Sequence, residues 1–178
     1  HLSIIVPVHN EEENILELYE KLYNTLSIIE KTYELIFVDD GSTDNTFEKI
    51  KSIKDSKVKV VRFQRNYGKA AALSCGFKKA KGDIVITLDG DLQDDPKEIP
   101  RFLEELKKYD MVSGWKSKRH DPISKTVPSR FFNWLTRLIT GVKINDFNCG
   151  YKAYNKYVVK NINLYGEQSR KKRIKMRY

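Results

Sequence analysis

The sequence predicts an α/β fold with a mostly parallel sheet and helices on both of its faces. Short runs with the composition of strands alternate with longer segments of helical periodicity, which is typical of strand–helix–strand units. Some of these strand-like runs are almost continuously apolar, as strands covered on both faces are. With 178 residues, 40% of them hydrophobic, the chain is long enough for one domain with a sizeable core.

Strand-like composition occurs in five segments. The first is apolar apart from Ser3, and the second and fourth are directly followed by acidic residues. In chain order, the expected strands are residues 2–7, 34–39, 58–63, 83–88 and 109–114.

Helical patterns fill the intervals between these strands. The expected helices are residues 11–29, 44–53, 68–80 and 96–108. The first carries apolar residues at helical spacing from Ile15 to Ile29, and the third is rich in alanine. We expect Asp44 to cap the second helix and Pro96 to open the fourth.

Beyond residue 114 the alternation stops. Residues 115–126 are polar and basic, as in a loop that closes over a substrate. From Pro128 we expect a helix with an apolar, largely aromatic stripe beside Arg130 and Arg137. This stripe either packs on the sheet or lies in a membrane interface, where aromatic residues beside arginines are common.

The net charge of +9 is concentrated at one end of the chain. Residues 170–178 carry six basic side chains and no acidic one, which leaves +3 for the other 169 residues. Such a tail is either solvated or attracted to an anionic membrane surface, and a nucleic-acid partner is not expected. No apolar window is long enough to span a membrane, and the two cysteines exclude a disulfide scaffold.

Acidic residues follow the expected strands where a ligand of an open α/β sheet would bind. Asp89 and Asp91 stand two residues apart around a glycine, so both carboxylates can approach one hard cation, and Gln93 offers a third oxygen. Mg²⁺ and Mn²⁺ combine few carboxylates with water and phosphate oxygens, which suits a bound nucleotide diphosphate. Neither a dinucleotide fingerprint nor a P-loop occurs. His9 and His120 are expected to be loop and surface residues.

The chain resembles the family 2 glycosyltransferases of the GT-A fold, which is Rossmann-like. The likeness covers roughly residues 2–165 and rests on four segments in the family's order: SIIVPVHNEE from Ser3, FVDDGSTD from Phe37, RNYGKA from Arg65 and TLDGDLQDDP from Thr87. The stretch NDFNCGYKAY from Asn145 is similar to the branch that charges polyprenyl phosphates, such as dolichyl-phosphate mannose synthases and undecaprenyl-phosphate glucosyltransferases.

The resemblance implies an inverting, metal-dependent glycosyltransferase that moves a sugar from a UDP- or GDP-sugar to a polyprenyl phosphate. The family's nucleotide-sugar contacts correspond in this sequence to Pro7, Glu11, Asp39, Asp40, Lys69 and Asp89. Among these, Asp39 would shape the loop that carries Asp40. The implied ligands of Mg²⁺ or Mn²⁺ are Asp89, Asp91 and Gln93. Lys116 and Arg130 would face the phosphates, and Asp146 would lie near the sugar and the acceptor. The implied catalytic residues are Asp91, Arg130 and Asp146.

Two other functions stay open at this stage. The acceptor could be a saccharide hydroxyl instead of a lipid phosphate, or the chain could bind nucleotide sugars or membrane surfaces without catalysis. We expect one domain over residues 1–167, truncated at its carboxyl-terminal end, and a basic tail over residues 168–178. The expected location is peripheral, on the cytoplasmic face of a membrane.

Overall fold

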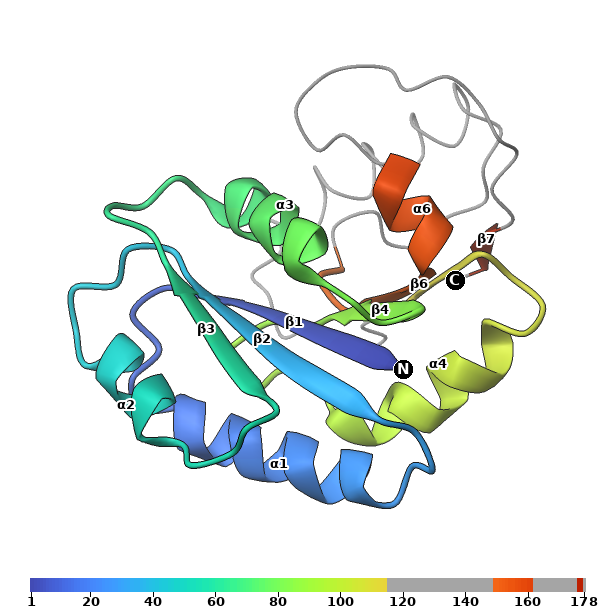
Figure 1. Cartoon of the computed structure of the whole chain (residues 1–178), viewed down its shortest axis with the longest axis horizontal. Helices are drawn as coiled ribbons and strands as arrows, with labels where there is room; N and C mark the ends of the chain where they lie inside the picture. The colour runs from blue at the N-terminus through green and yellow to red at the C-terminus, as the bar shows by residue number, and fades with distance from the viewer. Residues whose placement is uncertain (115–148, 162–175, 178) are drawn as a thin grey trace, which may run out of the picture.

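A mixed β-sheet is the centre of the structure, a computed structural model that describes residues 1–114, 149–161 and 176–177 (Figure 1). The strands are β1 (Leu2–Val8), β2 (Tyr33–Asp39), β3 (Val58–Arg62), β4 (Ile84–Thr87), β5 (Met111–Ser113), β6 (Lys152–Asn155) and β7 (Met176–Arg177). Their order across the sheet is β3-β2-β1-β4-β6-β5-β7. Only β6, among the described strands, runs antiparallel to its neighbours β4 and β5. The predicted mostly parallel α/β sheet is confirmed.

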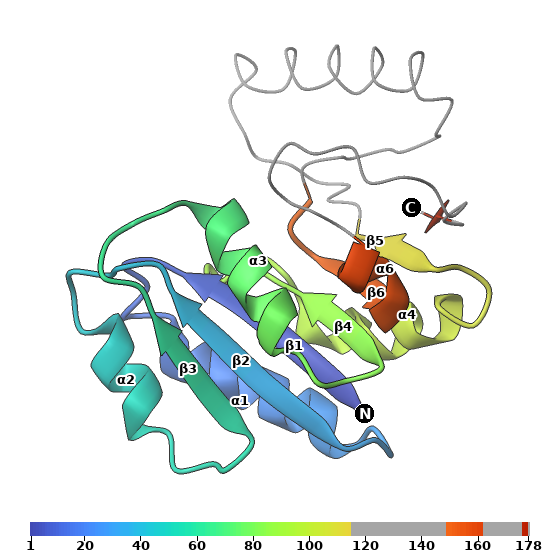
Figure 2. The ribbon, with the colours of Figure 1, turned by 45° about the horizontal axis from the view of Figure 1, so that its top comes forward.

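Helices cover both faces of the sheet (Figures 1 and 2). One face carries α1 (Ile15–Ser27), α2 (Thr46–Ser52), the 3₁₀ turn η1 (Pro96–Glu98) and α4 (Ile99–Glu105), and the other carries α3 (Lys69–Lys79) and α6 (Lys156–Asn161). In β1, Ile4 and Val6 belong to the apolar core under α1, whereas Ile5 belongs to the core under α3. This alternation explains why β1 is apolar at nearly every position.

The buried hydroxyl of Ser3 in β1 is satisfied by hydrogen bonds. This hydroxyl donates to Glu34 Oε1 at 2.6 Å and accepts from the Gly82 amide at 2.8 Å. Glu34 Oε2 pairs with Lys59 Nζ at 2.5 Å. Burial alone would raise the pKa of Glu34, but its hydrogen bonds to Lys59 and Ser3 hold that pKa below its ordinary value.

Three expected elements differ in detail from the structure. Helix α1 begins at Ile15 instead of residue 11. The Glu11 amide donates a hydrogen bond to Thr46 Oγ1, which holds Glu11 in a loop before the helix. The expected cap Asp44 precedes the capping position, which Asn45 occupies. The expected helix 96–108 is a 3₁₀ turn followed by an α-helix that ends at Glu105. Strand β6 and helix α6 were not predicted, because such short segments carry too little periodicity.

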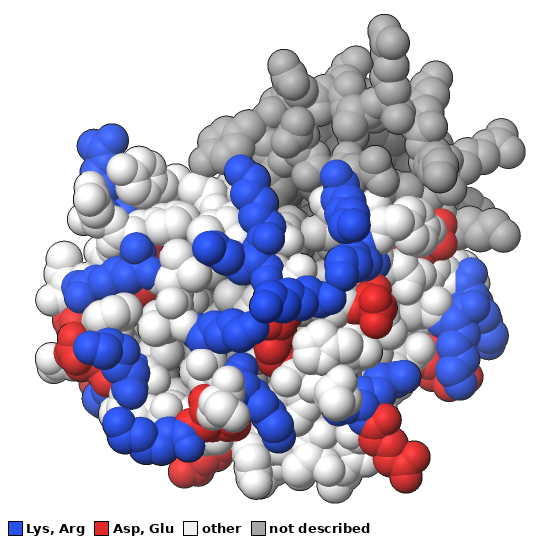
Figure 3. All heavy atoms as spheres, in the orientation of Figure 1, with Lys and Arg blue, Asp and Glu red and all other residues white. Residues whose placement is uncertain are grey.

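Charged side chains of both signs lie on the face drawn in Figure 3. Lys and Arg side chains predominate there and gather over its middle, with fewer Asp and Glu side chains between them. Several of them form ion pairs, such as Lys21 with Glu17 at 2.7 Å. None of the helices in the described ranges has the length and apolar composition that crossing a membrane requires.

Candidate functional site

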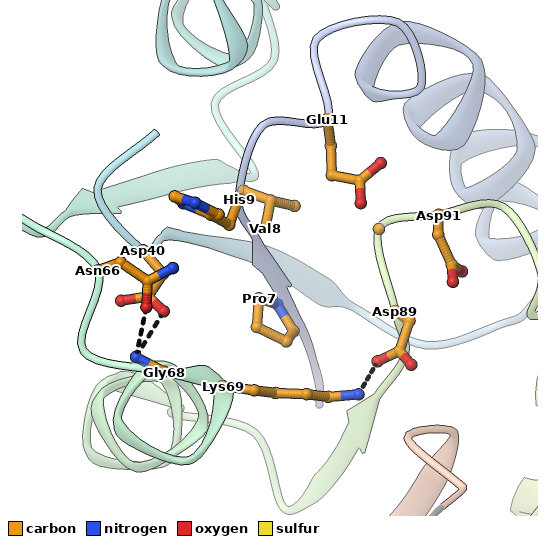
Figure 4. Close-up of a pocket in the computed structure, with 11 residues that line it drawn as sticks. Pro7, Val8, His9, Glu11, Asp40, Asn66, Gly68, Lys69, Asp89 and Asp91 are labelled. Carbon is orange, nitrogen blue, oxygen red and sulfur yellow. Dashed lines mark hydrogen bonds and ion pairs between the residues drawn. The ribbon is translucent and has the colours of Figure 1, made fainter. Parts of the chain in front are cut away.

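A pocket of about 280 Å³ lies beyond the carboxyl ends of β1, β2 and β4, beside the first turn of α3 (Figure 4). Its lining consists of Pro7, Val8, His9, Glu11, Asp40, Asn66, Gly68, Lys69, Asp89, Gly90 and Asp91. Loops that follow four different strands therefore contribute to one cavity. This is where open α/β sheets bind their ligands.

The wall beneath Glu11 consists of two loops that are hydrogen-bonded to each other. The Asn10 amide donates to Ser42 Oγ at 3.0 Å, and the Thr43 amide donates back to Asn10 Oδ1 at 2.9 Å. The Glu11 amide donates to Thr46 Oγ1 at 2.8 Å. Asn10 has a φ of 56°, in the left-handed region that asparagine tolerates better than most residues. The loop after β2 thus fixes the position of Glu11.

Asp39 supports the loop after β2 from inside the protein. Its side chain is fully buried, and Oδ1 accepts a hydrogen bond from the Ser42 amide at 2.9 Å. Its other oxygen, Oδ2, lies 3.3 Å from Arg62 Nε in an ion pair. Asp39 does not line the pocket, so it acts on the site only through the shape of this turn.

Asp40 connects the loop after β2 to the loop before α3. Its carboxylate accepts backbone hydrogen bonds from Tyr67 at Oδ1 and from Gly68 at Oδ2, both at 2.8 Å. The residue is only 4% exposed. Gly41 has a φ of 70°, and a Cβ at this position would overlap the backbone of Arg65. Asp40 and Gly41 therefore hold the loop before α3 tightly against the end of β2.

Lys69 and Asp89 form an ion pair at the edge of the pocket. The Lys69 side chain extends from the first position of α3 to Asp89, and its Nζ lies 2.5 Å from Asp89 Oδ1 (Figure 4). On its other side the Asp89 carboxylate packs against Gly150, where a Cβ would overlap both carboxylate oxygens. Thr87 holds this glycine by donating from Oγ1 to the Gly150 carbonyl at 2.7 Å. Asp89 is thus confined between a lysine and a glycine.

The loop from Asp89 to Asp95 is ordered by its own carboxylates. Asp94 is buried, and its Oδ2 accepts a hydrogen bond from the Asp89 amide at 2.9 Å. Asp91 Oδ1 accepts from the Gln93 amide at 3.1 Å. Leu92, between them, has a φ of 62° and packs against the core beneath α1. These contacts hold Asp91 at the pocket, with a strained backbone at its next residue.

Tyr151 anchors the far end of this loop. Its hydroxyl donates to the Asp95 carbonyl at 3.1 Å. Burial, and next the negative charge of Asp94, raise the pKa of Tyr151 well above its ordinary value. Both effects favour the protonated hydroxyl, which is the form that donates to Asp95.

The structure brings most of the predicted site residues together, and their roles remain predictions. Those that line the pocket are Pro7, Glu11, Asp40, Lys69, Asp89 and Asp91. Gln93 is exposed and, like Asp39, is not part of the lining. Lys116, Arg130 and Asp146 lie outside the described residues, as do the loop 115–126, the helix expected from Pro128 and most of the basic tail.

Sequence reasoning missed two polar residues of the pocket, His9 and Asn66. His9 is exposed directly after β1, and Asn66 lies in the loop between β3 and α3. Neither residue lies at a sequence distance from another potential ligand that is typical of metal sites. Their position after the end of a parallel strand is the signal that could have identified them.

The carboxylates of the pocket fit a divalent cation only in part. Among the described residues, no group of three or more His, Cys, Asp and Glu side chains could hold a metal ion. Asp89 and Asp91 nevertheless bring two carboxylates to one cavity. Mg²⁺ usually takes one or two carboxylates and completes its shell with water and substrate phosphates. The pair therefore fits a cation that arrives with a phosphate ligand.

Comparisons with known proteins assign this chain to a family. The model of the family described as Glycosyl transferase family 2 matches residues 3–162. Dodecaprenyl-phosphate galacturonate synthase of Rhizobium johnstonii is 38% identical over 175 residues, which cover 95% of this chain and 52% of that protein. Undecaprenyl-phosphate 4-deoxy-4-formamido-L-arabinose transferase of Proteus mirabilis is 38% identical over 162 residues, or 89% of this chain and 50% of that protein. The chain spans about half the length of these relatives.

Solved structures share the fold. Glucosyl-3-phosphoglycerate synthase of Mycobacterium tuberculosis, in complex with Mn²⁺, uridine diphosphate and phosphoglyceric acid, aligns with a TM-score of 0.71 at 20% identity, over 90% of this chain and 57% of that one. A mannosyltransferase of Pyrobaculum calidifontis, in complex with GDP-mannose and Mn²⁺, aligns with a TM-score of 0.65 at 24% identity, over 89% of this chain and 45% of that one. At these identities the likeness establishes the GT-A fold alone.

Proposed function

This chain belongs to glycosyl transferase family 2, and on that basis we propose that it provides the donor site of an enzyme that transfers a sugar from a nucleotide sugar to a polyprenyl phosphate. The supporting observation is the pocket in which acidic residues from three strand ends meet Lys69. Two relatives that cover most of the chain are named for transfer to dodecaprenyl and undecaprenyl phosphate. These names favour a lipid phosphate over a saccharide hydroxyl as the acceptor.

The pocket suits the nucleotide diphosphate part of such a donor. Lys69 offers a cationic group to the phosphates, and Glu11 lies across the pocket from it (Figure 4). We place the nucleoside against Pro7 and Glu11. Both oxygens of Asp40 already accept backbone amides. A carboxylate oxygen has a second lone pair, so Asp40 can still accept from a base N–H while it holds the loop. Uracil and guanine both offer such a group, which is why UDP- and GDP-sugars are proposed together.

Asp91 and Asp89 are the residues that we propose to hold Mg²⁺ or Mn²⁺, with Gln93 as a further ligand. Such an ion would neutralise the negative charge that develops on the leaving nucleotide diphosphate. The chain's own contribution is to hold the carboxylates in place. The Asp94 carboxylate and the partly buried Leu92 side chain, which packs against the core, fix the loop on which both aspartates stand.

The acceptor determines what further catalysis is needed. A phosphate monoester has a second pKa of about 6, so a polyprenyl phosphate is mostly dianionic at neutral pH. It can attack the anomeric carbon without a strong general base, from the face opposite the leaving group, and thereby invert that carbon. We propose that Lys116 and Arg130 bind the phosphates and that Asp146 orients the reacting groups. A lipid acceptor also favours a peripheral location at a membrane.

Donor binding is the direct test of this proposal. Calorimetric titration with UDP-glucose, UDP-N-acetylglucosamine and GDP-mannose, each with and without Mn²⁺, should show metal-dependent binding of at least one donor. Asp91→Ala should abolish the metal-dependent part, whereas Lys79→Ala, at the exposed far end of α3, should leave it unchanged. If no donor binds in a metal-dependent way, the donor site is wrongly assigned.

Product analysis tests the acceptor. Incubation of the chain and its bound donor with a short-chain polyprenyl phosphate should give the glycosylated lipid, and oligosaccharides should give no product. Transfer to oligosaccharides alone would replace the proposed acceptor class, while donor binding would stand.

A further inference from the structure

The Lys69–Asp89 ion pair occupies the place where a cation would approach Asp89. Lys69 Nζ lies 2.5 Å from Asp89 Oδ1, and both side chains line the pocket. Both oxygens of the carboxylate also lie against Gly150, where a Cβ atom would overlap them. Asp89 is therefore already neutralised by the protein's own ammonium group.

No other carboxylate of the described pocket offers Lys69 an equivalent partner. Asp40 accepts backbone amides with both oxygens, and Asp91 holds the Gln93 amide. Glu11 accepts from Asn14 Nδ2 at 2.6 Å, on the side of the pocket next to α1. Among the carboxylates of the described pocket, Asp89 is the one that forms an ion pair with Lys69.

The position of Lys69 in α3 makes this pairing unusual. Lysine at the first position of a helix faces the positive end of the helix dipole, and α3 has no acidic residue in its first turn. Its side chain is 48% exposed, so it can move without disturbing the core. A nucleotide diphosphate would offer it a second anion within the same pocket.

We propose that Lys69 is a resident cation that makes divalent-ion binding depend on the nucleotide. A divalent ion on its own must displace the ammonium group from Asp89 or share the carboxylate with it at the cost of like-charge repulsion. A nucleotide diphosphate removes this obstacle, because it attracts Lys69 and also supplies the oxygen ligands that the protein lacks. The ion and the nucleotide then bind together, each raising the affinity of the other by the same factor. This inference rests on the proposed function.

Lys69 could also do no more than contact the phosphates of the nucleotide. The affinity for Mn²⁺ in the absence of nucleotide distinguishes that role from competition between Lys69 and the ion for Asp89. Free Mn²⁺ is measured by electron paramagnetic resonance during titration of the chain, without nucleotide and then with saturating UDP or GDP. In Lys69→Met, Mn²⁺ alone should bind roughly fivefold more tightly, the size of effect expected from one partly exposed ion pair. The same variant should bind nucleotide in the presence of Mn²⁺ less tightly. The two changes have opposite signs, which a merely unfolded or loosened pocket would not produce.

Two variants serve as controls. Lys69→Arg keeps the positive charge and should bind Mn²⁺ alone as weakly as the unchanged chain does. Lys79→Met removes a lysine from the exposed last turn of the same helix and should change neither affinity.

The outcomes separate the inference from the proposed function. If the unchanged chain binds nucleotide with Mn²⁺ but Lys69→Met binds Mn²⁺ alone no more tightly, the inference is overturned and the proposed function stands. If the unchanged chain binds neither UDP nor GDP in the presence of Mn²⁺, the proposed function fails and the inference fails with it.

Discussion

Asp40 accepts hydrogen bonds from the amides of Tyr67 and Gly68, so we expect Asp40→Asn to be measurably less stable. The carboxylate accepts two backbone amides, one on each oxygen, at 2.8 Å, and it is almost completely buried. An asparagine would keep one acceptor oxygen and turn an NH₂ group toward the other amide. One charge-assisted hydrogen bond is then lost, which costs about 1.5–3 kcal/mol.

Chemical denaturation measures this loss. Urea unfolding followed by circular dichroism should give a free energy of unfolding lower by about 1.5–3 kcal/mol, and a melting temperature lower by about 3–12 °C in a domain of this size. Asp91→Asn is the matched control, because an asparagine there keeps the acceptor for the Gln93 amide. Its stability should change by less than about 0.5 kcal/mol.

Nucleotide binding should weaken in both variants, but for different reasons. In Asp40→Asn the loop bearing Gly68 and Lys69 loses its anchor, whereas in Asp91→Asn one carboxylate charge disappears from an intact pocket. If Asp40→Asn proves as stable as the unchanged chain, the carboxylate does not hold the loop. Its importance would then lie only in direct contact with a ligand.

Two further predictions concern buried contacts. The lowered pKa of Glu34 means that its contribution to stability is present above pH 4.5 and is lost as the pH falls below that value. Glu34→Gln should therefore reduce the free energy of unfolding at pH 7 more than at about pH 3, and an equal reduction at both would contradict this linkage. Gly150→Ala should push the Asp89 carboxylate from its place, cost about 1–3 kcal/mol of stability by overpacking and weaken Mn²⁺-dependent nucleotide binding. Unchanged melting and binding would show that the site accommodates the extra carbon atom.

The parallel half of the sheet could be predicted because its signal is local. Strand β1 is apolar on both faces, and the acids that follow β2 and β4 stand directly at the strand ends. Parallel strands end at the same edge, so the meeting of Asp40, Asp89 and Asp91 follows once the sheet is recognised. The antiparallel β6 and the helix after it follow no such local pattern.

The contacts that order the site could not be predicted in the same way. Asp40 bonds to backbone amides 27 and 28 residues away, and amides are present at nearly every position of any sequence. The pairing of Lys69 with Asp89 and the packing of Gly150 against the same carboxylate depend on loop shapes that only the folded chain defines. Sequence reasoning therefore assigned Asp40 to the ligand and missed its role in the fold.

The position of a bound metal ion would show whether Asp91 belongs to the donor site that we propose. Crystals of the chain soaked with Mn²⁺ and UDP or GDP should give an anomalous difference peak beside the Asp91 carboxylate, at a coordination distance of about 2.0–2.6 Å. Phosphate oxygens of the nucleotide should complete the shell of the ion. A nucleotide bound without a metal peak at Asp91, or a peak at another edge of the sheet, would contradict the account.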